Sequence, residues 1–296
     1  MATGLSLSST SNLTSGQKIF IERAMLAFEP AAPGPDLVDN KRIDVGVKDW
    51  VINTYARLAT SDALTEGTDL SQVQQLVTAT LSITPSEHGT IVTLSKRLIR
   101  RQGDSDVVGV AGEQAAGSLR RRMDLDVIAL FDGFSKSIVG ASNQMDVTHF
   151  RGGVAFLLTD NDSAFGPAPL PFNADFHIEQ ISDIILDITD PGTAAGSRPA
   201  GFGDEMLQRW WRGSDRLYGI GIFHGGNITR DSNGDSKGAI FASGALYLVI
   251  ANEVDPTEEP DNSHRIIEYG IFQEWGEAER ADPHGIEVFS DTSATV

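Results

Sequence analysis

The clearest pattern of apolar positions lies in the middle of the chain, over residues 105–134. Apolar residues recur there at every fourth position, which is the period of an α-helix and not of a strand. The stripe consists of Val107, Ala111, Ala115, Leu119, Met123, Val127 and Phe131, and it is widened by Ala116, Leu130 and Phe134. At about 1.5 Å per residue, this segment predicts a single helix roughly 40 Å long, which is too long for an ordinary connecting helix.

The residues before this helix predict extended structure. Residues 41–60 alternate between apolar and polar positions, and residues 63–69 form a turn-rich tip. Residues 73–83 and 90–98 are rich in β-branched and apolar residues, and residues 85–89 between them contain a proline and a glycine. We therefore expect these two runs to pair as a hairpin.

The second half of the chain mixes both kinds of element. Residues 147–158 and 177–188 predict two more helices. The expected strands cover residues 218–223, 239–251, 265–275 and 285–289, with residues 231–238 as a turn. Towards the N-terminus, residues 1–14 read as an extended arm and residues 16–28 as a short helix. Helices and strands are segregated rather than alternating, which favours an α+β fold.

Composition narrows the class of protein. The chain has 296 residues, of which 40% are hydrophobic, so it can bury a large core. It has no run of eighteen apolar residues and no signal-peptide pattern, and we expect no contact with a membrane. The absence of cysteine excludes thiol catalysis, disulfides and thiolate metal sites, and it fits production in the cytoplasm.

Charge argues against recognition of nucleic-acid sequence. The net charge is −18, and residues 251–296 contain 12 acidic residues against two arginines. Such a surface repels phosphate backbones. The simplest reading of these acids is a solvated face that keeps the protein soluble.

Candidate catalytic chemistry is sparse. None of the six histidines has the close spacing of metal ligands, and Asp231, Asn233 and Asp235 lack the glycine and glutamate that complete a calcium loop. We therefore expect no catalytic residue, no metal and no cofactor. A soluble hydrolase or binding protein with a site near His177, His224 and Asp231 stays open as an alternative.

Two basic clusters and one aromatic pair are candidate contact residues. The first cluster is Lys96, Arg97, Arg100 and Arg101, and the second is Arg120, Arg121 and Arg122 within the long helix. Both suit DNA phosphates or an acidic partner, including the acidic C-terminal region of another subunit. Trp210 and Trp211, flanked by arginines, suit either the core or an interface.

Four stretches, taken together, resemble the major capsid proteins of tailed double-stranded DNA bacteriophages, which have the Hong Kong 97-type fold. Residues 63–69 followed by 83–98 look like the extended loop and its return strand. Residues 106–134 look like the spine helix, with Arg122-Met-Asp-Leu-Asp126 in its second half. Residues 165–170 are similar to the axial domain, and residues 225–229 and 238–245 are similar to the stretch leading back to the peripheral domain.

The resemblance implies a division of the chain into four parts. Residues 1–48 would be an N-terminal arm and residues 49–98 the extended β-hairpin loop. Residues 99–140 and 246–296 would form the peripheral domain, including the spine helix 105–134. Residues 141–245 would form the axial domain.

The resemblance also implies a function without catalysis. Copies of the chain would form hexamers and pentamers that close into an icosahedral head around double-stranded DNA, and the protein would reside in the virion after assembly in the host cytoplasm. A scaffold protein, a portal and a decoration protein are the expected further partners. An encapsulin, a compartment of the same fold that holds cargo enzymes, is the alternative.

Particular residues follow from this resemblance. Leu64, Glu66 and Asp69 at the loop tip, with Trp210 and Trp211, would contact neighbouring subunits. The basic patch Arg120, Arg121 and Arg122 would face the interior. Some relatives cross-link through a lysine on the extended loop, but no lysine lies between Asp49 and Ser95, so that chemistry should be absent here. Only about fifty residues precede the expected hairpin, which favours a separate scaffold protein.

Overall fold

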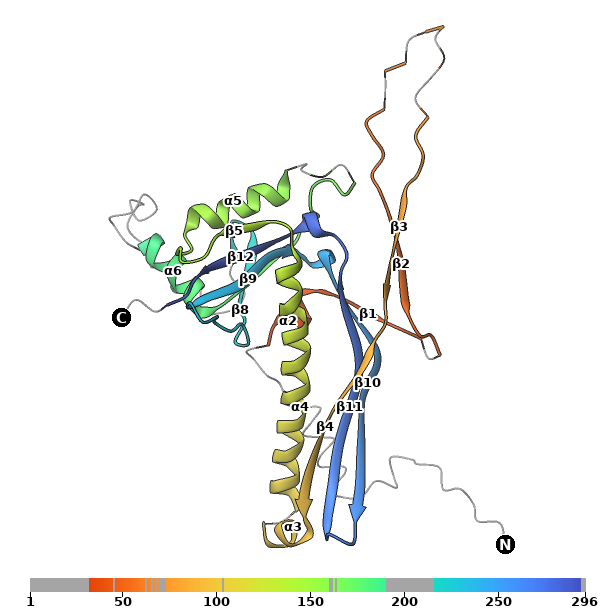
Figure 1. Ribbon diagram of the computed structural model, residues 1–296, viewed down its shortest axis with the longest axis vertical. Helices are drawn as coiled ribbons and strands as arrows, with labels where there is room; N and C mark the ends of the chain where they lie inside the picture. The colour runs from red at the N-terminus through yellow and green to blue at the C-terminus, as the bar shows by residue number, and fades with distance from the viewer. Residues whose placement is uncertain are drawn as a thin grey trace. The chain divides into compact units, whose positions relative to one another are not determined.

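The computed structural model describes residues 32–44, 46–61, 63, 64, 66, 67, 69, 73–102, 104–159, 162, 164–189 and 216–293. It contains both helices and strands, as the α+β prediction requires, although single strands and helices alternate between Ser137 and Leu217 (Figure 1). The predicted arm helix at 16–28 and the pair Trp210 and Trp211 lie outside the described residues. No helix among the described residues is long and apolar enough to cross a membrane.

The chain divides into two compact units. The first contains Ser86–Met123 and Ile250–Trp275, and the second contains Ala31–Pro85, Asp124–Val249 and Gly276–Val296. The predicted four-part division is not tested by this partition and stays a prediction.

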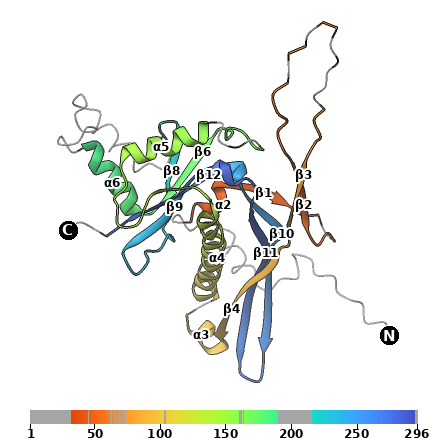
Figure 2. The same ribbon diagram turned by 45° about the horizontal axis from the view of Figure 1, so that its top comes forward.

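The first unit is built on long antiparallel strands. They are β4 (Ser86–Ser95), β10 (Leu246–Asp261) and β11 (Ile266–Glu279), which are neighbours in the order β10-β11-β4. One face of this sheet is buried by Leu94, Tyr269, Ile271 and Trp275. In Figures 1 and 2 this sheet runs alongside the first part of helix α4 (Asp104–Ala129), and the Thr90 hydroxyl donates to the Ser118 hydroxyl at 3.4 Å.

Helix α4 confirms the long helix that the apolar period predicts. Ala111, Ala115, Leu119, Met123 and Val127 are all buried at intervals of four residues. At its start the buried position is Val108 rather than Val107, because a straight helix with 3.6 residues per turn drifts away from a strict four-residue repeat. The last turn tightens into the 3-10 helix η2 (Leu130–Gly133), which still buries Phe131.

The second unit contains a mixed six-stranded sheet with two helices. In spatial order the strands are β5 (Ser137–Val139), β12 (Gly285–Asp291), β9 (Asp235–Ala242), β6 (Phe172–Phe176), β8 (Ile220–His224) and β7 (Arg216–Leu217). Helices α5 (Val147–Leu158) and α6 (Ile178–Thr189) contribute Phe150, Leu157 and Ile184 to the core on this sheet (Figure 2). Both helices agree with the sequence prediction.

Gln180, Asp124 and Asp175 are buried polar residues of this unit, and the first two form hydrogen bonds. The Gln180 amide donates to the Ser290 hydroxyl at 2.8 Å and to the carbonyl oxygens of Ser236 and Val288 at 3.2 Å. Asp124 accepts from the Gly34 amide and from the Asn227 side chain, both at 2.8 Å. Asp175 is fully buried, and neither of its oxygens has a hydrogen-bond partner among the described residues.

The second unit also holds the N-terminal elements and two short helical turns. These are α2 (Gly34–Leu37), β1 (Asp39–Arg42), β2 (Trp50–Tyr55), β3 (Thr78–Ile83), η3 (Ser243–Ala245) and η4 (Asp282–His284). Strand β1 joins the edge of the sheet formed by β10, β11 and β4. Strands β2 and β3 form a separate two-stranded sheet.

The structure corrects the predicted pairing of residues 73–83 with 90–98. Strand β3 pairs with β2, whereas β4 pairs with β11. The glycine and proline between the two runs predict a turn in the sequence. Gly89 instead lies inside β4. A glycine is needed there because the ring of Phe272 fills the space that a side chain would occupy.

Two further strand predictions are wrong in their limits. Residues 96–98 belong to helix α3 (Lys96–Gln102), whose first turn is capped by the Ser95 hydroxyl accepting from the Leu98 amide at 3.1 Å. The predicted strand 239–251 is two strands, β9 and β10, which lie in different sheets and are separated by η3. Strand β9 also begins earlier than predicted, at Asp235, which lies within the predicted turn of residues 231–238.

Candidate functional site

The candidate site is the two-stranded hairpin of β2 and β3. Its register pairs Trp50 with Ile83 and Ile52 with Leu81, so these four apolar side chains share one face. The opposite face carries Asn53 and Thr80, whose side chains are hydrogen-bonded at 3.0 Å, together with Val51 and Tyr55. Successive residues of β2 point to opposite faces, as expected of the extended structure predicted for residues 41–60.

Beyond the strands the hairpin continues as a long open loop (Figure 1). The Ala56 amide donates to the Val77 carbonyl at 2.9 Å, and the Gln74 side chain donates to the Ala59 carbonyl at 3.1 Å. These bonds tie the two arms together where regular strand pairing has ended. The tip residues Leu64, Glu66 and Asp69 are all exposed, as an intermolecular contact requires.

The exposed surface of this hairpin is unusually apolar. Leu64 is 76% exposed and Val73 is 92% exposed. The other large apolar side chains exposed along it are Val51, Tyr55, Leu58, Leu76 and Val77. A two-stranded ribbon of this kind is marginally stable by itself in water, and its exposed apolar residues make it the candidate contact surface.

Arg57 anchors one arm of the hairpin to the rest of its unit. Its backbone amide donates to the Ala164 carbonyl at 2.7 Å. Its guanidinium lies against Gly166, where a Cβ atom would be 2.8 Å from Nη1 and where φ is +72°. A side chain at Gly166 would therefore both strain the backbone and displace Arg57.

Arg120, Arg121 and Arg122 do not form one compact patch. Consecutive helical residues point about 100° apart, so three of them fan over more than half of the helix circumference. Arg121 and Arg122 are exposed, whereas Arg120 is half-buried. The predicted role of these arginines at the capsid interior stays a prediction.

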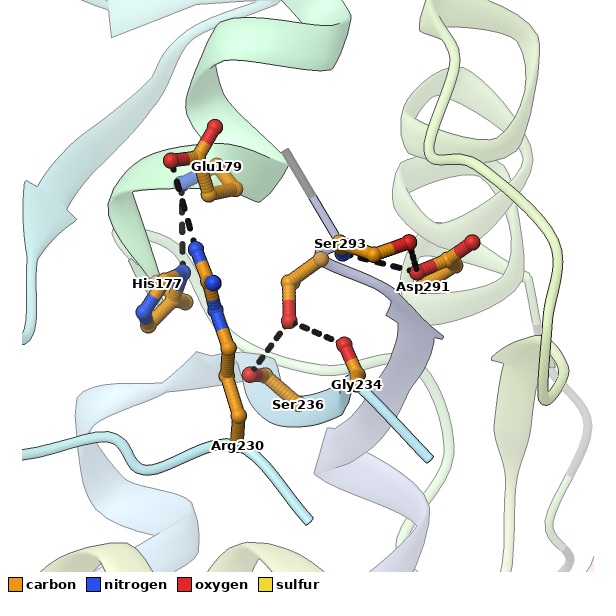
Figure 3. A network of polar contacts seen from close by, with 8 residues as sticks. His177, Glu179, Arg230, Gly234, Ser236, Asp291 and Ser293 are labelled. Carbon is orange, nitrogen blue, oxygen red and sulfur yellow. Dashed lines mark hydrogen bonds and ion pairs between the residues drawn. The ribbon is translucent and has the colours of Figure 1, made fainter. Parts of the chain in front are cut away.

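The alternative site near His177, His224 and Asp231 has a structural explanation. His177 precedes α6, and its Nδ1 accepts from the Glu179 amide at 3.2 Å while its own amide donates to Gln180 Oε1 at 3.0 Å. This is a reciprocal helix cap. Figure 3 shows His177 beside Glu179 and Arg230, which form an ion pair at 3.3 Å. Burial, followed by the nearby Arg230 charge, lowers the pKa of His177.

The other two residues of that alternative are also accounted for locally. His224 ends β8 and pairs with Phe176 of β6, and burial lowers its pKa. Asp231 Oδ1 accepts from the amides of Asn233 and Asp235 at 2.8 and 2.9 Å, which makes the tight turn favoured over a calcium loop. Within the described part of the chain, no group of three or more potential ligands is placed to hold a metal ion.

The sequence did not single out most of the exposed apolar residues of the hairpin. Only the tip residue Leu64 was named, whereas Val51, Tyr55, Leu58 and Val73 were not. The available signal was a break in the alternation, since Trp50, Val51 and Ile52 are apolar in succession although a two-stranded ribbon can bury only one face.

Comparisons with known proteins identify the fold. No protein-family model matches the chain, and no curated protein matches it either. Among solved structures, the head of Helicobacter pylori bacteriophage KHP40 is 12% identical with a TM-score of 0.66, covering 99% of this chain and 100% of that chain. The capsid of Ralstonia phage GP4 is 10% identical with a TM-score of 0.66, covering 88% of each chain. The capsid of cyanophage P-SCSP1u is 14% identical with a TM-score of 0.64, covering 98% of this chain and 94% of that chain.

These likenesses define the class of fold. The chain has the fold of tailed-phage capsid proteins over nearly its whole length. The predicted α+β class and the predicted resemblance to these capsid proteins are confirmed at this level.

Proposed function

We propose that this chain is a major capsid protein that assembles into hexamers and pentamers and closes into an icosahedral head around double-stranded DNA. The observation that carries the proposal is a capsid fold whose projecting hairpin exposes an apolar surface. A structural role without catalysis follows from the same fold. The virion is the corresponding location, and the host cytoplasm is the place of assembly.

The hairpin supplies the proposed contact between subunits. Its tip, with Leu64, Glu66 and Asp69, lies over a neighbouring copy and buries there the apolar side chains that one copy leaves in water. Residues 1–40 reach to another neighbour. Contacts of this heterologous kind build a ring when the rotation between copies closes, and a shell follows from rings of two sizes.

The charge of the chain fits a container for DNA. A net charge of −18 keeps most of its surface from adhering to the packaged phosphates. Arg120, Arg121 and Arg122 provide a limited basic surface for DNA or for a scaffold protein. A scaffold, a portal and a decoration protein complete the proposed set of partners, and cross-linking through a hairpin lysine is not part of the mechanism.

Electron microscopy of the purified protein tests the proposal. The protein is expressed alone and together with its neighbouring genes, and both preparations are imaged in negative stain. Closed shells, hexamer sheets or tubes support it. A homogeneous monomer or dimer in both preparations refutes it.

The encapsulin alternative predicts the same particles with different contents. The matched solved structures described above are phage capsids and heads, which favours the phage head. Nucleic acid inside particles purified from infected cells supports a head, and protein cargo supports a compartment.

A further inference from the structure

We propose that the outer face of the β4–β11–β10 sheet is a docking surface for helix α3 of a second copy of this chain. The proposal rests on the self-assembly argued above and names two surfaces that meet within it. We call the first surface the acidic sheet face and the second the basic α3 face.

The acidic sheet face follows from strand register. Residues directly opposite each other on paired strands share a face, so Glu87, Ile91 and Thr93 of β4 lie with Glu274, Gly270 and Glu268 of β11. A Cβ atom on Gly270 would lie 2.6 Å from the Thr257 hydroxyl, which places Thr257 of β10 on the same face. Alternate residues of β10 then bring its acids to this face. The carboxylates on it are Glu87, Glu253, Asp255, Glu259, Asp261, Glu268 and Glu274.

Among the described residues, this face is the more exposed side of the sheet. Its opposite side is the buried one, with Tyr269, Ile271 and Trp275. Glu87, Asp255 and Glu259 are exposed. No lysine or arginine occupies the described positions of this face on the three strands.

The acidic sheet face is unfavourable in an isolated chain. Glu87 and Glu274 are directly opposite each other, and like charges in such a cross-strand pair destabilise a sheet. Ile91, at the centre of the face, is 57% exposed. A partner that brings positive charge and a small apolar contact would relieve both conditions.

The basic α3 face has the complementary chemistry. At about 100° per residue, Lys96, Arg97, Arg100 and Arg101 fall within roughly 140° of the helix circumference. Arg97, Arg100 and Arg101 are exposed, and none of the three forms an ion pair with a carboxylate of the described residues. Leu98, which is 38% exposed, lies one turn before Arg101 and can meet an apolar residue such as Ile91.

The basic α3 face is also self-repelling. Lys96 and Arg100, and likewise Arg97 and Arg101, are like charges four residues apart, and such pairs destabilise a helix. Both surfaces belong to the same unit of the chain, so every copy presents one of each. Pairing the helix of one copy with the sheet of the next is therefore a heterologous contact that repeats around a ring.

Reciprocal charge reversal tests this contact. Arg100→Glu with Arg101→Glu reverses the helix, and Asp255→Lys with Glu259→Lys reverses the sheet. We expect each double variant to lose at least tenfold in shell or ring yield, and the fourfold variant to regain a yield within about threefold of the wild type. The matched control, Lys48→Glu with Arg151→Glu, makes the same charge change at exposed positions of the other unit and should assemble normally.

The outcomes separate this proposal from the proposed function. If the wild type assembles and either reversal assembles equally well, or if the fourfold variant is not rescued, the contact is wrong although the capsid function stands. Binding of α3 to DNA or to a scaffold predicts the second of these results. If the wild type does not assemble at all, the proposed function itself fails.

A cysteine pair provides a direct readout because the chain has no cysteine of its own. Arg101→Cys and Glu259→Cys are combined in one chain, and assembled protein is oxidised with oxidised glutathione. We expect a ladder of covalent trimers and larger species on a non-reducing gel, whereas either cysteine alone stops at a dimer. A monomer closed by an internal disulfide would place the contact within one copy and overturn the proposal.

Discussion

The ring of Phe272 occupies the space beside Gly89 on the paired strands β4 and β11, where a Cβ atom on Gly89 would lie 2.3 Å from Cδ1 of Phe272. The glycine that resembles a turn residue in the sequence is therefore required for side-chain packing across two strands. The contribution of this contact to the stability of the β4–β11 pair can be tested by adding a single methyl group to Gly89.

Gly89→Ala should destabilise the unassembled protein by about 1–3 kcal/mol, since the new methyl group overlaps the Phe272 ring. The measurement is urea unfolding followed by circular dichroism. Adding Phe272→Leu to this variant should recover part of the loss. Gly152→Ala is the matched control, because no atom lies within 4 Å of its added Cβ and the site is inside helix α5, so a gain of about 0.5–1 kcal/mol is expected.

Two half-buried carboxyl groups should contribute more to the stability of the folded protein in acid than at neutral pH, because their pKa values are raised. Burial, followed by the Asp282 charge, raises the pKa of Glu279 from 4.5 to about 7. Burial, followed by the Glu179 charge, raises the pKa of Asp183 from 3.8 to about 6. A raised pKa means that the folded state holds its proton more tightly than the unfolded state does. The contribution of the two groups to the free energy of unfolding is therefore complete below about pH 4, and it is lost as the pH rises through 6 and 7.

Glu279→Gln combined with Asp183→Asn imitates the protonated forms and should remove that loss. We expect the melting temperature of the unassembled variant to exceed that of the wild type by about 2–4 °C at pH 8, and the gap to shrink towards pH 4. The comparison must be made between variant and wild type, because His177, His224 and His284 have lowered pKa values and give the opposite slope near pH 6. A gap that is the same at pH 4 and pH 8 would contradict this account.

The exposed apolar residues of the hairpin should matter for assembly and not for the fold of one chain. Leu64→Asp with Val73→Asp should reduce shell yield by at least tenfold, since two apolar contacts are replaced by buried charges. The melting temperature of the unassembled protein should stay within about 2 °C of the wild type. Leu158→Asp, at another half-exposed apolar position at the end of α5, is the control and should assemble normally. Normal assembly of the hairpin variant would show that the tip is not a contact.

The arginines of α4 should affect DNA or scaffold and not the shell contacts. Replacing Arg120, Arg121 and Arg122 together by glutamine should lower the yield of DNA-filled heads several-fold while rings of subunits still form. The readouts are the DNA content of purified heads and the subunit assembly state by sedimentation. If neither head yield nor DNA retention changes, these side chains serve only local ion pairs.

The sequence predicted the elements whose pattern is local. Helix α4 is visible because its buried residues repeat along one stripe, and α5 and α6 are visible for the same reason. The α+β class follows from these elements and the short strands. None of these predictions required knowledge of which segments pair.

Strand pairing was predicted less well, because it depends on contacts between distant residues. The partner of β4 is β11, more than 170 residues away, and nothing near Gly89 in the sequence indicates Phe272. The start of α3 was missed although its signal is present, since Ser95 is a standard capping residue that directly precedes the basic helix. For the candidate site, the sequence pointed to the tip, which stays a prediction as a contact, and not to the apolar arms, because exposure is a property of the fold and not of residue type.

The two-stranded construction of β2 and β3 has a consequence for how a shell would grow. A ribbon held by one ladder of hydrogen bonds has a local unfolding free energy near zero, so its amides should exchange with deuterium quickly in a free subunit and slowly in a particle. Part of the favourable free energy of each contact would then be offset by the entropy lost when the ribbon becomes ordered. Each single docking event would therefore be weak and reversible. A subunit added in the wrong orientation would dissociate before its neighbours close around it. The accuracy of assembly would thus depend on the low stability of the isolated hairpin.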